Sequence, residues 1–220
     1  MTPTHIKSDF LFPTIINRFF IENSSILNLS ETYNKILNLK GHPTTTPHEI
    51  LPDSYTTSDD LHLNENFSEE VKILSKCFKV SLDSMAIQYD DIDMTCMWAN
   101  FAGPNQIYNH NSHNHPNSFL SCAFYVNVPL SDKNTISFDD PRAVRDCIIP
   151  NYRDDIESPE KYNANWFNTA TGLIIVFPSW LKHSVPPSTW KSDYRMVISA
   201  NIIPISDCKR FTMKSKYRKS

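Results

Sequence analysis

The residues best suited to chemistry are three histidines whose spacing favours metal binding. His113 and His115 are two residues apart, and His183 follows 68 residues later. Neutral imidazoles that converge on one point are common ligands of transition metals. On one strand, His113 and His115 would project from the same face because side chains alternate, and His183 would close the site from a distant strand. The same alternation places His110 on the opposite face, although a looped segment would make it a further ligand candidate.

A buried cation is predicted beyond the last of these histidines. Arg195 lies in the apolar segment YRMVISANII, twelve residues after His183. An unpaired buried charge is very costly, so Arg195 requires an anionic partner, and its planar guanidinium matches a carboxylate. Ser199 has the same strand parity as Arg195, and Tyr125 lies on the strand after the histidine pair. The hydroxyl groups of both residues can therefore donate hydrogen bonds to that carboxylate. A structural salt bridge is the alternative.

The composition is that of a globular protein. Hydrophobic residues make up 40% of the 220 residues and aromatic residues 12%, which is enough for a sizeable core. The formal net charge is −3, which argues against bulk attraction to nucleic acid. The charge is uneven, because residues 209–220 hold six basic and no acidic residues, which leaves 15 basic and 24 acidic residues in residues 1–208. A basic carboxy-terminal tail is the one segment expected to attract nucleic acid or another anion.

The five cysteines are scattered and show no CxxC spacing, which argues against a disulfide framework and a zinc finger. The amino terminus lacks the pattern of a signal peptide, and the apolar runs are too short to cross a bilayer. We therefore expect a protein of the cytoplasm with no membrane partner.

The elements that must position the site follow an α+β order that is mainly β. Residues 9–21 are predicted to be extended, residues 25–39 helical and residues 40–60 a loop. A second helix is predicted to begin near Asn66 as its N-cap. Strand patterns follow from Met94 onward. This predicts one domain, residues 1–208, with helical support in residues 1–90, packed outside a β core in residues 91–208, and a tail in residues 209–220.

Two segments resemble a known enzyme family. The carboxy-terminal part resembles the end of the 2-oxoglutarate and iron(II)-dependent dioxygenase fold, in GLIIVFPSWLKHSVPPSTWKSDYRMVISANII. Its prolyl-hydroxylase branch has a similar order of strand, histidine, loop, arginine and strand. The first ligand motif of the family is similar to QIYNHNSHNHPNSFLSCAFYVNVPLSDKNTISFDDPR. The chain looks most similar to small oxygenases of marine bacteria and phages, and the resemblance covers about residues 94–204.

The resemblance implies a fold, a reaction and roles for the site residues. The fold would be a double-stranded β-helix, or jelly roll. His113 and His183 would be iron ligands, Arg195 would pair with the C5 carboxylate of 2-oxoglutarate, and Ser199 and Tyr125 would be secondary contacts of that cosubstrate. Fe(II), 2-oxoglutarate and O2 would together hydroxylate a substrate, with release of succinate and CO2.

The third ligand departs from the usual motif of the family. That motif is His-x-Asp/Glu, whereas this chain has His115 at the third position. A face of three histidines gives the metal one more positive charge than a face with a carboxylate. Asp139 or Asp140 can supply the carboxylate instead, although the sequence FDDPR favours a turn before Pro141. We prefer His115 because of its spacing from His113.

Two further interpretations remain. A metal-binding jelly roll of the cupin type would use the same histidines without 2-oxoglutarate, but it leaves Arg195 without a role. A binding module would use the basic tail. The sequence does not select the substrate, because a protein side chain, a nucleobase and a small molecule are all compatible with this set of residues.

Overall fold

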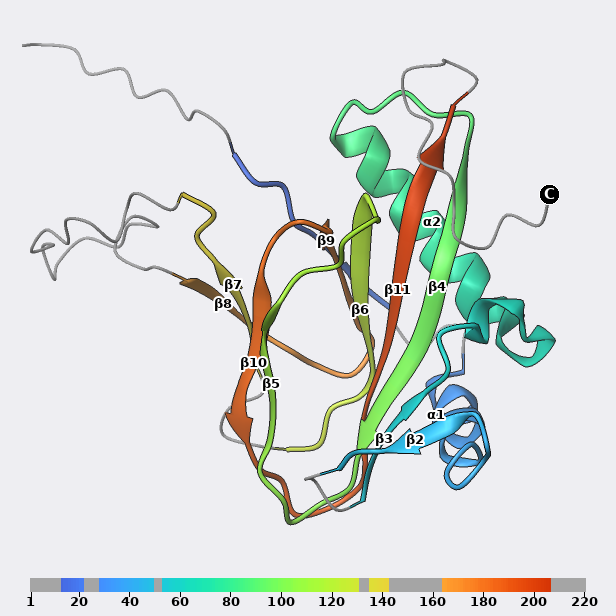
Figure 1. The fold of residues 1–220 in the computed structure, drawn as a ribbon, viewed down its shortest axis with the longest axis vertical. Helices are drawn as coiled ribbons and strands as arrows, with labels where there is room; N and C mark the ends of the chain where they lie inside the picture. The colour runs from blue at the N-terminus through green and yellow to red at the C-terminus, as the bar shows by residue number, and fades with distance from the viewer. Residues whose placement is uncertain (1–12, 22–27, 50–52, 131–134, 143–163, 207–220) are drawn as a thin grey trace, which may run out of the picture.

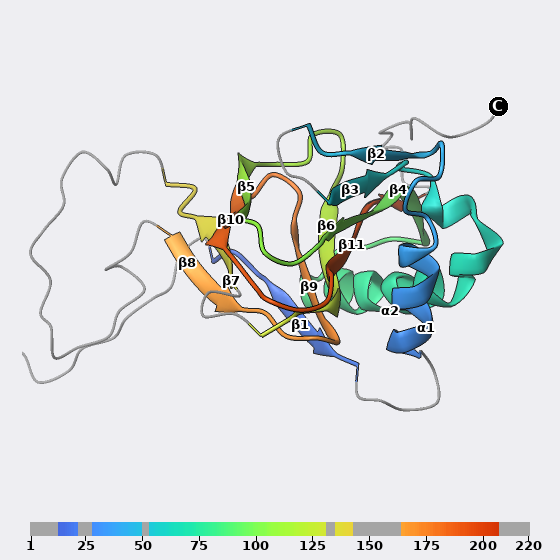
Figure 2. The ribbon, with the colours of Figure 1, turned by 90° about the horizontal axis from the view of Figure 1, so that it is seen from below.

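The structure is a computed structural model that describes residues 13–21, 28–49, 53–130, 135–142 and 164–206. Among these residues the chain forms two helices and two antiparallel sheets. The sheets face each other, and both helices lie on the outer side of the larger sheet (Figures 1 and 2). This is the predicted jelly roll with helices packed outside it.

The larger sheet has seven strands in the order β1-β9-β6-β11-β4-β3-β2. Its long central pair is antiparallel, with β11 running from Arg195 opposite Ala102 to Ile205 opposite Asp91 on β4. The bounds of its strands are β1 (Asn17–Phe20), β2 (Thr45–Pro47), β3 (Ser54–Thr57), β4 (Asp91–Ala102), β6 (Leu120–Asn127), β9 (Leu173–Pro178) and β11 (Arg195–Ile205).

The smaller sheet has four strands in the order β5-β10-β7-β8. Their bounds are β5 (Tyr108–His113), β7 (Thr135–Asp139), β8 (Ala164–Asn168) and β10 (His183–Ser188). Because β5 and β10 are neighbours, residues 70 positions apart in the sequence lie side by side, with His183 opposite His113.

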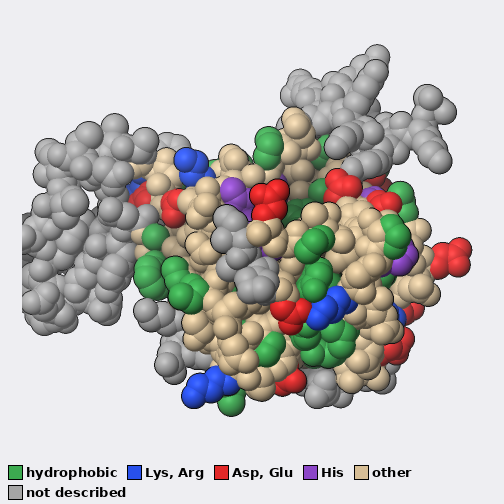
Figure 3. Space-filling view, turned by 60° about the horizontal axis from the view of Figure 1, so that its bottom comes forward, with side chains coloured by type: hydrophobic (Ala, Val, Ile, Leu, Met, Phe, Trp, Pro, Cys, Tyr) green, Lys and Arg blue, Asp and Glu red, His purple; other side chains and the backbone are tan. Residues whose placement is uncertain are grey.

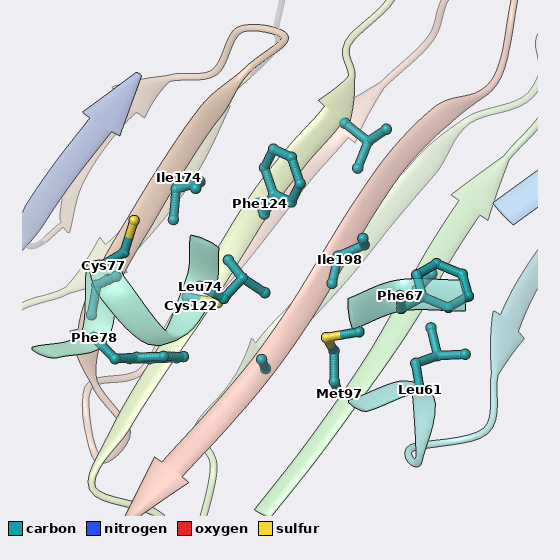
Figure 4. Packing of buried hydrophobic residues seen from close by; sticks show 14 of the residues in the cluster. Leu61, Phe67, Leu74, Cys77, Phe78, Met97, Cys122, Phe124, Ile174 and Ile198 are labelled. Atoms are coloured by element: carbon teal, nitrogen blue, oxygen red, sulfur yellow. The ribbon is translucent and has the colours of Figure 1, made fainter. Parts of the chain in front are cut away.

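Strand alternation divides the larger sheet into a face toward the helices and a face toward the smaller sheet. On β4, Met97 and Phe101 are buried among residues of both helices. The main core therefore lies between α2 (Ser68–Ser84) and the sheet, where Leu74 and Phe78 of α2 meet side chains of β4, β6, β9 and β11 (Figure 4). The residues at the alternate positions of these strands point to the other face of the sheet and line the space between the two sheets.

Both helices are amphipathic, but they begin differently: α1 has an N-cap side chain, whereas α2 follows a 3-10 turn. Helix α1 (Leu29–Leu37) is capped by Asn28, whose side chain accepts hydrogen bonds from the amides of Ser30 and Glu31. The predicted N-cap of the second helix, Asn66, is wrong. A short 3-10 turn, η2 (Glu65–Phe67), precedes α2, and Asn64 caps that turn.

The prediction of a loop over residues 40–60 is wrong in part. Two short strands, β2 and β3, form a hairpin there and extend the larger sheet, with β3 pairing along β4. The threonines of this segment are β-branched and suit an edge strand. The region expected to be helical support thus also contributes strands. The predicted domain limits stay a prediction, and the basic tail lies outside the described residues.

Candidate metal and cosubstrate site

The three predicted metal ligands come together between the sheets. His113 is the last residue of β5 and His183 the first residue of β10, and these two residues are paired in register. One ring nitrogen of each of His113, His115 and His183 lies within 4.8 Å of the others. The ring centroids of His113 and His183 are 4.3 Å apart, and those of His115 and His183 are 5.1 Å apart. The spacing suits one metal ion.

His115 reaches this point by a different route from the one predicted. It lies in the turn beyond the end of β5, so strand alternation does not position it. Its backbone amide donates a hydrogen bond to the carbonyl of Ser179, at 2.9 Å, which fastens the turn to the end of β9. The side chain also contacts Trp98, with ring centroids 5.6 Å apart. The turn and this ring contact hold the third imidazole toward the other two.

Backbone carbonyls orient two of the imidazoles. Nδ1 of His113 lies 2.8 Å from the carbonyl oxygen of Asn111, and Nδ1 of His183 lies 3.1 Å from that of Leu181. A ring nitrogen that donates to a carbonyl leaves the other nitrogen, Nε2, as the lone-pair ligand for a metal. Both rings are therefore preset for coordination through Nε2.

Burial keeps the imidazoles in the form that binds metals. Desolvation, followed by the field of the neighbouring histidines, lowers the pKa of His183 to about 3 and that of His115 to about 4. His183 is buried with 7% of its surface exposed. At neutral pH these two rings are uncharged, so metal binding there requires no loss of a proton.

His110 lies inside the site, and the prediction that it points to the opposite face is wrong. Its ring centroid is 4.6 Å from that of His113, and the two Nδ1 atoms are 3.4 Å apart. The cause is a bulge in β5: His113 pairs with His183, but His110 pairs with Val185, so the two residues of β5 between these pairs face one residue of β10. A bulge of this kind reverses the side-chain parity beyond it.

The two aspartates considered as alternative ligands lie outside the histidine group. The carboxylate of Asp139 accepts a hydrogen bond from the hydroxyl of Ser112. The carboxylate of Asp140 accepts from the backbone amide of Arg142, at 3.0 Å, and forms an ion pair with its guanidinium. Asp140 thus has the predicted turn-capping contact, and neither aspartate is in the cluster of potential ligands among the described residues.

Arg195 is the first residue of β11 and is buried, with 4% of its surface exposed. Its guanidinium lies over two tyrosine rings, 5.2 Å from the centroid of Tyr108 and 5.5 Å from that of Tyr125. No carboxylate among the described residues forms an ion pair with it. The structural salt bridge, which was the alternative explanation of this arginine, is therefore absent from the described residues. Because a buried cation without an anion is very costly, the site suits an anionic ligand.

A cavity of about 70 Å³ joins Arg195 to the histidines. Ser199 lies on the same face of β11 as Arg195 and also lines this cavity, as does Tyr125. Burial raises the pKa of Tyr125 to about 12 and also raises that of Tyr108, despite the opposing field of Arg195. Both phenols therefore remain protonated hydrogen-bond donors at neutral pH.

Sequence reasoning did not find two polar residues of this cavity, Asn100 and Tyr108, and it kept His110 only as a ligand candidate for a looped segment. Asn100 shares the parity of Trp98 on β4, so extending the alternation by one step would have found it. Tyr108 lies directly before the histidine segment and had no functional pattern of its own. His110 could be placed only by knowing the bulge.

Two facing antiparallel sheets with converging imidazoles between them define a metal-binding protein of the double-stranded β-helix class. Residues 96–201 match the model of a family described as "Putative 2OG-Fe(II) oxygenase". Residues 96–201, which carry the site, therefore match the superfamily of 2-oxoglutarate and Fe(II)-dependent oxygenases, which are oxidoreductases. A search of curated proteins found no match.

Solved structures share this fold at low sequence identity. A prolyl-4-hydroxylase of Pseudomonas putida is 11% identical, with a TM-score of 0.54, and the match covers 88% of this chain and 94% of that one. The α-ketoglutarate-dependent epimerase SnoN of nogalamycin biosynthesis is 10% identical, with a TM-score of 0.56 and coverage of 87% and 79%. A 2OG-Fe(II) oxygenase family protein of Burkholderia pseudomallei is 12% identical, with a TM-score of 0.51 and coverage of 84% of each chain.

The site agrees with the cofactor and cosubstrate of this superfamily, which are Fe(II) and 2-oxoglutarate, with O2 as the oxidant. Neutral imidazoles suit a divalent iron ion, and a buried arginine that has no carboxylate partner among the described residues suits a dicarboxylate. In the described part of the chain, no helix combines the length and the apolar character needed to span a membrane.

Proposed function

We propose that this protein hydroxylates a C–H bond of its substrate, with His113, His115 and His183 holding Fe(II) and Arg195 holding 2-oxoglutarate. The observation that carries the residue assignment is the buried guanidinium of Arg195. It has no ion pair among the described carboxylates, and it lines the same cavity as the three imidazoles. A dicarboxylate that contacts iron at one end would supply the missing anion at the other.

Three residues would contact the C5 end of 2-oxoglutarate. The guanidinium of Arg195 pairs with the C5 carboxylate in two-point geometry. The hydroxyl of Ser199 and the phenol of Tyr125 donate to the same end of the molecule. Tyr108 and Tyr125 pack against the guanidinium and limit its movement. The bound iron and 2-oxoglutarate supply the oxidising chemistry: one atom of O2 enters succinate as CO2 leaves, and the other becomes the hydroxyl group of the product.

The competing function is a cupin-type metal site without 2-oxoglutarate. It would use the same three histidines but would leave the buried charge of Arg195 uncompensated by any carboxylate of the described residues. We therefore favour the oxygenase. This fold also supports reactions with other outcomes, since SnoN is an epimerase, so hydroxylation is the part of the proposal that product analysis must test.

The first experiment is an anaerobic titration of Fe(II) and 2-oxoglutarate, followed by the visible metal-to-ligand charge-transfer band. We expect a band in the wild type, none in His183→Ala, and a much weaker affinity for 2-oxoglutarate in Arg195→Ala. Arg18→Ala is the matched control. Arg18 lies on β1, where its guanidinium contacts the ring of Phe167 on β8, and it does not line the cavity. Tight zinc or manganese binding without any band would favour the cupin-type site.

The partner of this reaction is a protein side chain, a nucleobase or a small molecule. A role in nucleic-acid binding would belong to the tail in residues 209–220, which holds six basic and no acidic residues. On the face of the described residues in Figure 3, basic and acidic side chains are scattered among the others. We place the protein in the cytoplasm, in keeping with the free thiols of Cys77, Cys96 and Cys122.

A further inference from the structure

A second and larger hollow lies directly beside the metal site. Its volume is about 410 Å³, and it shares two lining residues, Trp98 and His115, with the smaller cavity around the histidines. A volume of this size is within the range of pockets that bind small molecules or side chains. One wall of this hollow is therefore a proposed iron ligand, His115.

The walls of the hollow are fixed by hydrogen bonds. Its floor comes from β4 and β11, and its wall is the segment from Thr56 to Asp59, which runs along β4. The amide of Met97 donates to the carbonyl of Asp59, at 2.9 Å, and the amide of Ala99 donates to the hydroxyl of Thr57, at 2.9 Å. The hollow is thus a built part of the fold.

One polar atom on the floor has no hydrogen-bond partner among the described residues. Asn201 is buried, with 5% of its surface exposed, and lines the hollow. Its side-chain Nδ2 donates to the sulfur of Cys96, at 3.1 Å, whereas its Oδ1 has no hydrogen-bond partner in the part of the chain that the structure describes. Because a buried acceptor left unsatisfied costs about 1–3 kcal/mol, this oxygen is suited to a ligand that brings a hydrogen-bond donor.

The charge around the hollow is negative. The carboxylate of Asp59 lines it, and no lysine or arginine of the described residues does. The indole of Trp98 adds an aromatic surface of the kind that attracts cations.

We propose that this hollow binds the substrate and that it recognises an ammonium group, which donates a hydrogen bond to Oδ1 of Asn201 in the field of Asp59. The inference rests on the proposed function, since it names the substrate class of the same site. Because His115 lines the same hollow, a ligand whose ammonium group is held by Asn201 and Asp59 would have its other atoms within the space that adjoins the proposed iron site.

The test measures binding without requiring turnover. The probes are N-acetyl-lysine methylamide, which is an ammonium ion, its Nε-acetylated form, which is neutral, and N-acetyl-glutamate methylamide, which is an anion. Each is titrated into the full chain while the side-chain amide signal of Asn201 is followed by NMR, first without metal and then with Zn(II) and 2-oxoglutarate. We expect only the ammonium probe to shift this signal.

Two variants and a control define the recognition. Loss of a hydrogen bond or of an ion pair with a charged group weakens binding by about tenfold or more, so Asp59→Asn and Asn201→Ala should each reduce the affinity for the ammonium probe by about that factor. For Asn201→Ala, the shift is read on the indole signal of Trp98. Glu69→Gln, on the outer face of α2, removes an acidic charge away from the hollow and should leave the affinity unchanged.

The outcomes separate this inference from the proposed function. Equal shifts with all three probes, no shift with any of them, or an affinity unaffected by Asp59→Asn would overturn the ammonium site, even if the charge-transfer band of iron and 2-oxoglutarate is present. An ammonium-specific shift without that band would refute the oxygenase and leave the ammonium site standing.

A further comparison identifies the source of the ammonium group. If it belongs to a small metabolite, 1,4-diaminobutane should bind at least as tightly as the lysine derivative. If it belongs to a protein, a short peptide with one central lysine should bind more tightly than both, because its flanking residues add contacts. Either result supports the recognition of an ammonium group, and failure of all these amines to bind contradicts it.

Discussion

At the scale of single residues, the third metal ligand distinguishes this site from the usual His-x-Asp/Glu pattern. His115 lies with the other two histidines, whereas the carboxylate of Asp139 contacts Ser112. We expect His115→Ala to reduce Fe(II) affinity by more than the roughly 10- to 100-fold that is typical for loss of a supporting residue. Asp139→Asn should change it less than twofold, by isothermal titration under anaerobic conditions. The reverse order would make Asp139 the ligand.

The shape of the cation, and not only its charge, matters at position 195. Lysine keeps the charge but loses the planar fork that matches a carboxylate. Loss of one charge-assisted hydrogen bond corresponds to about a tenfold or greater loss of affinity. We therefore expect Arg195→Lys to raise the dissociation constant for 2-oxoglutarate by at least that factor while Fe(II) affinity stays unchanged. Equal 2-oxoglutarate affinity in both proteins would contradict two-point recognition.

At the scale of elements, a buried carboxylate joins the two helices that cover the larger sheet. Glu70 of α2 is fully buried, and its Oε1 accepts hydrogen bonds from the hydroxyl of Thr32, at 2.6 Å, and from the amine of Lys35, at 3.3 Å, both on α1. Glu70→Ala leaves the buried hydroxyl of Thr32 without this acceptor, and such a loss costs about 1–3 kcal/mol.

We expect urea denaturation to show this loss for Glu70→Ala. Glu31→Ala is the matched control, since Glu31 also pairs with Lys35 but is exposed, and exposed pairs of this kind contribute about 0.3–0.5 kcal/mol. Equal losses in the two variants would mean that the buried contact between the helices adds nothing.

The positions of the elements explain which parts of the site could be predicted. On β11, a regular alternation connects Arg195 to Ser199, so sequence parity was enough to place both in the cavity. On β5, one extra residue in the pairing shifts His110 to the inner face, and a sequence has no periodic signal for such a bulge. Similarly, β2 and β3 are strands because β4 offers them an edge, which is a property of the assembled sheet and not of the threonines alone.

At the scale of the whole molecule, the low pKa values of the buried histidines predict how stability depends on pH. The unfolded chain binds protons on histidine near pH 6.5, whereas folded His115 and His183 do so only near pH 4 and 3. Between these values the unfolded state carries more protons, so the free energy of unfolding falls as the pH falls.

We therefore expect the metal-free protein, in the presence of a chelator, to have a lower free energy of unfolding at pH 5 than at pH 7.5, by urea denaturation. The contribution is fully present above about pH 6.5 and is lost progressively toward pH 3. His183→Gln should lose less stability over the same interval, because glutamine does not titrate. An identical pH dependence in both proteins would show that His183 is protonated equally in the folded and unfolded states.

The division of the site between the two sheets has a mechanical consequence. The strands β5 and β10, which carry His113 and His183, belong to the smaller sheet, whereas Arg195 and Ser199 belong to the larger one. Iron alone would tie together only the smaller sheet and its adjoining turn. A cosubstrate that chelates the iron and also contacts Arg195 would act as a reversible cross-link between the sheets. Amide hydrogen exchange at the margins of both sheets should therefore slow when 2-oxoglutarate joins the metal, and much less with the metal by itself.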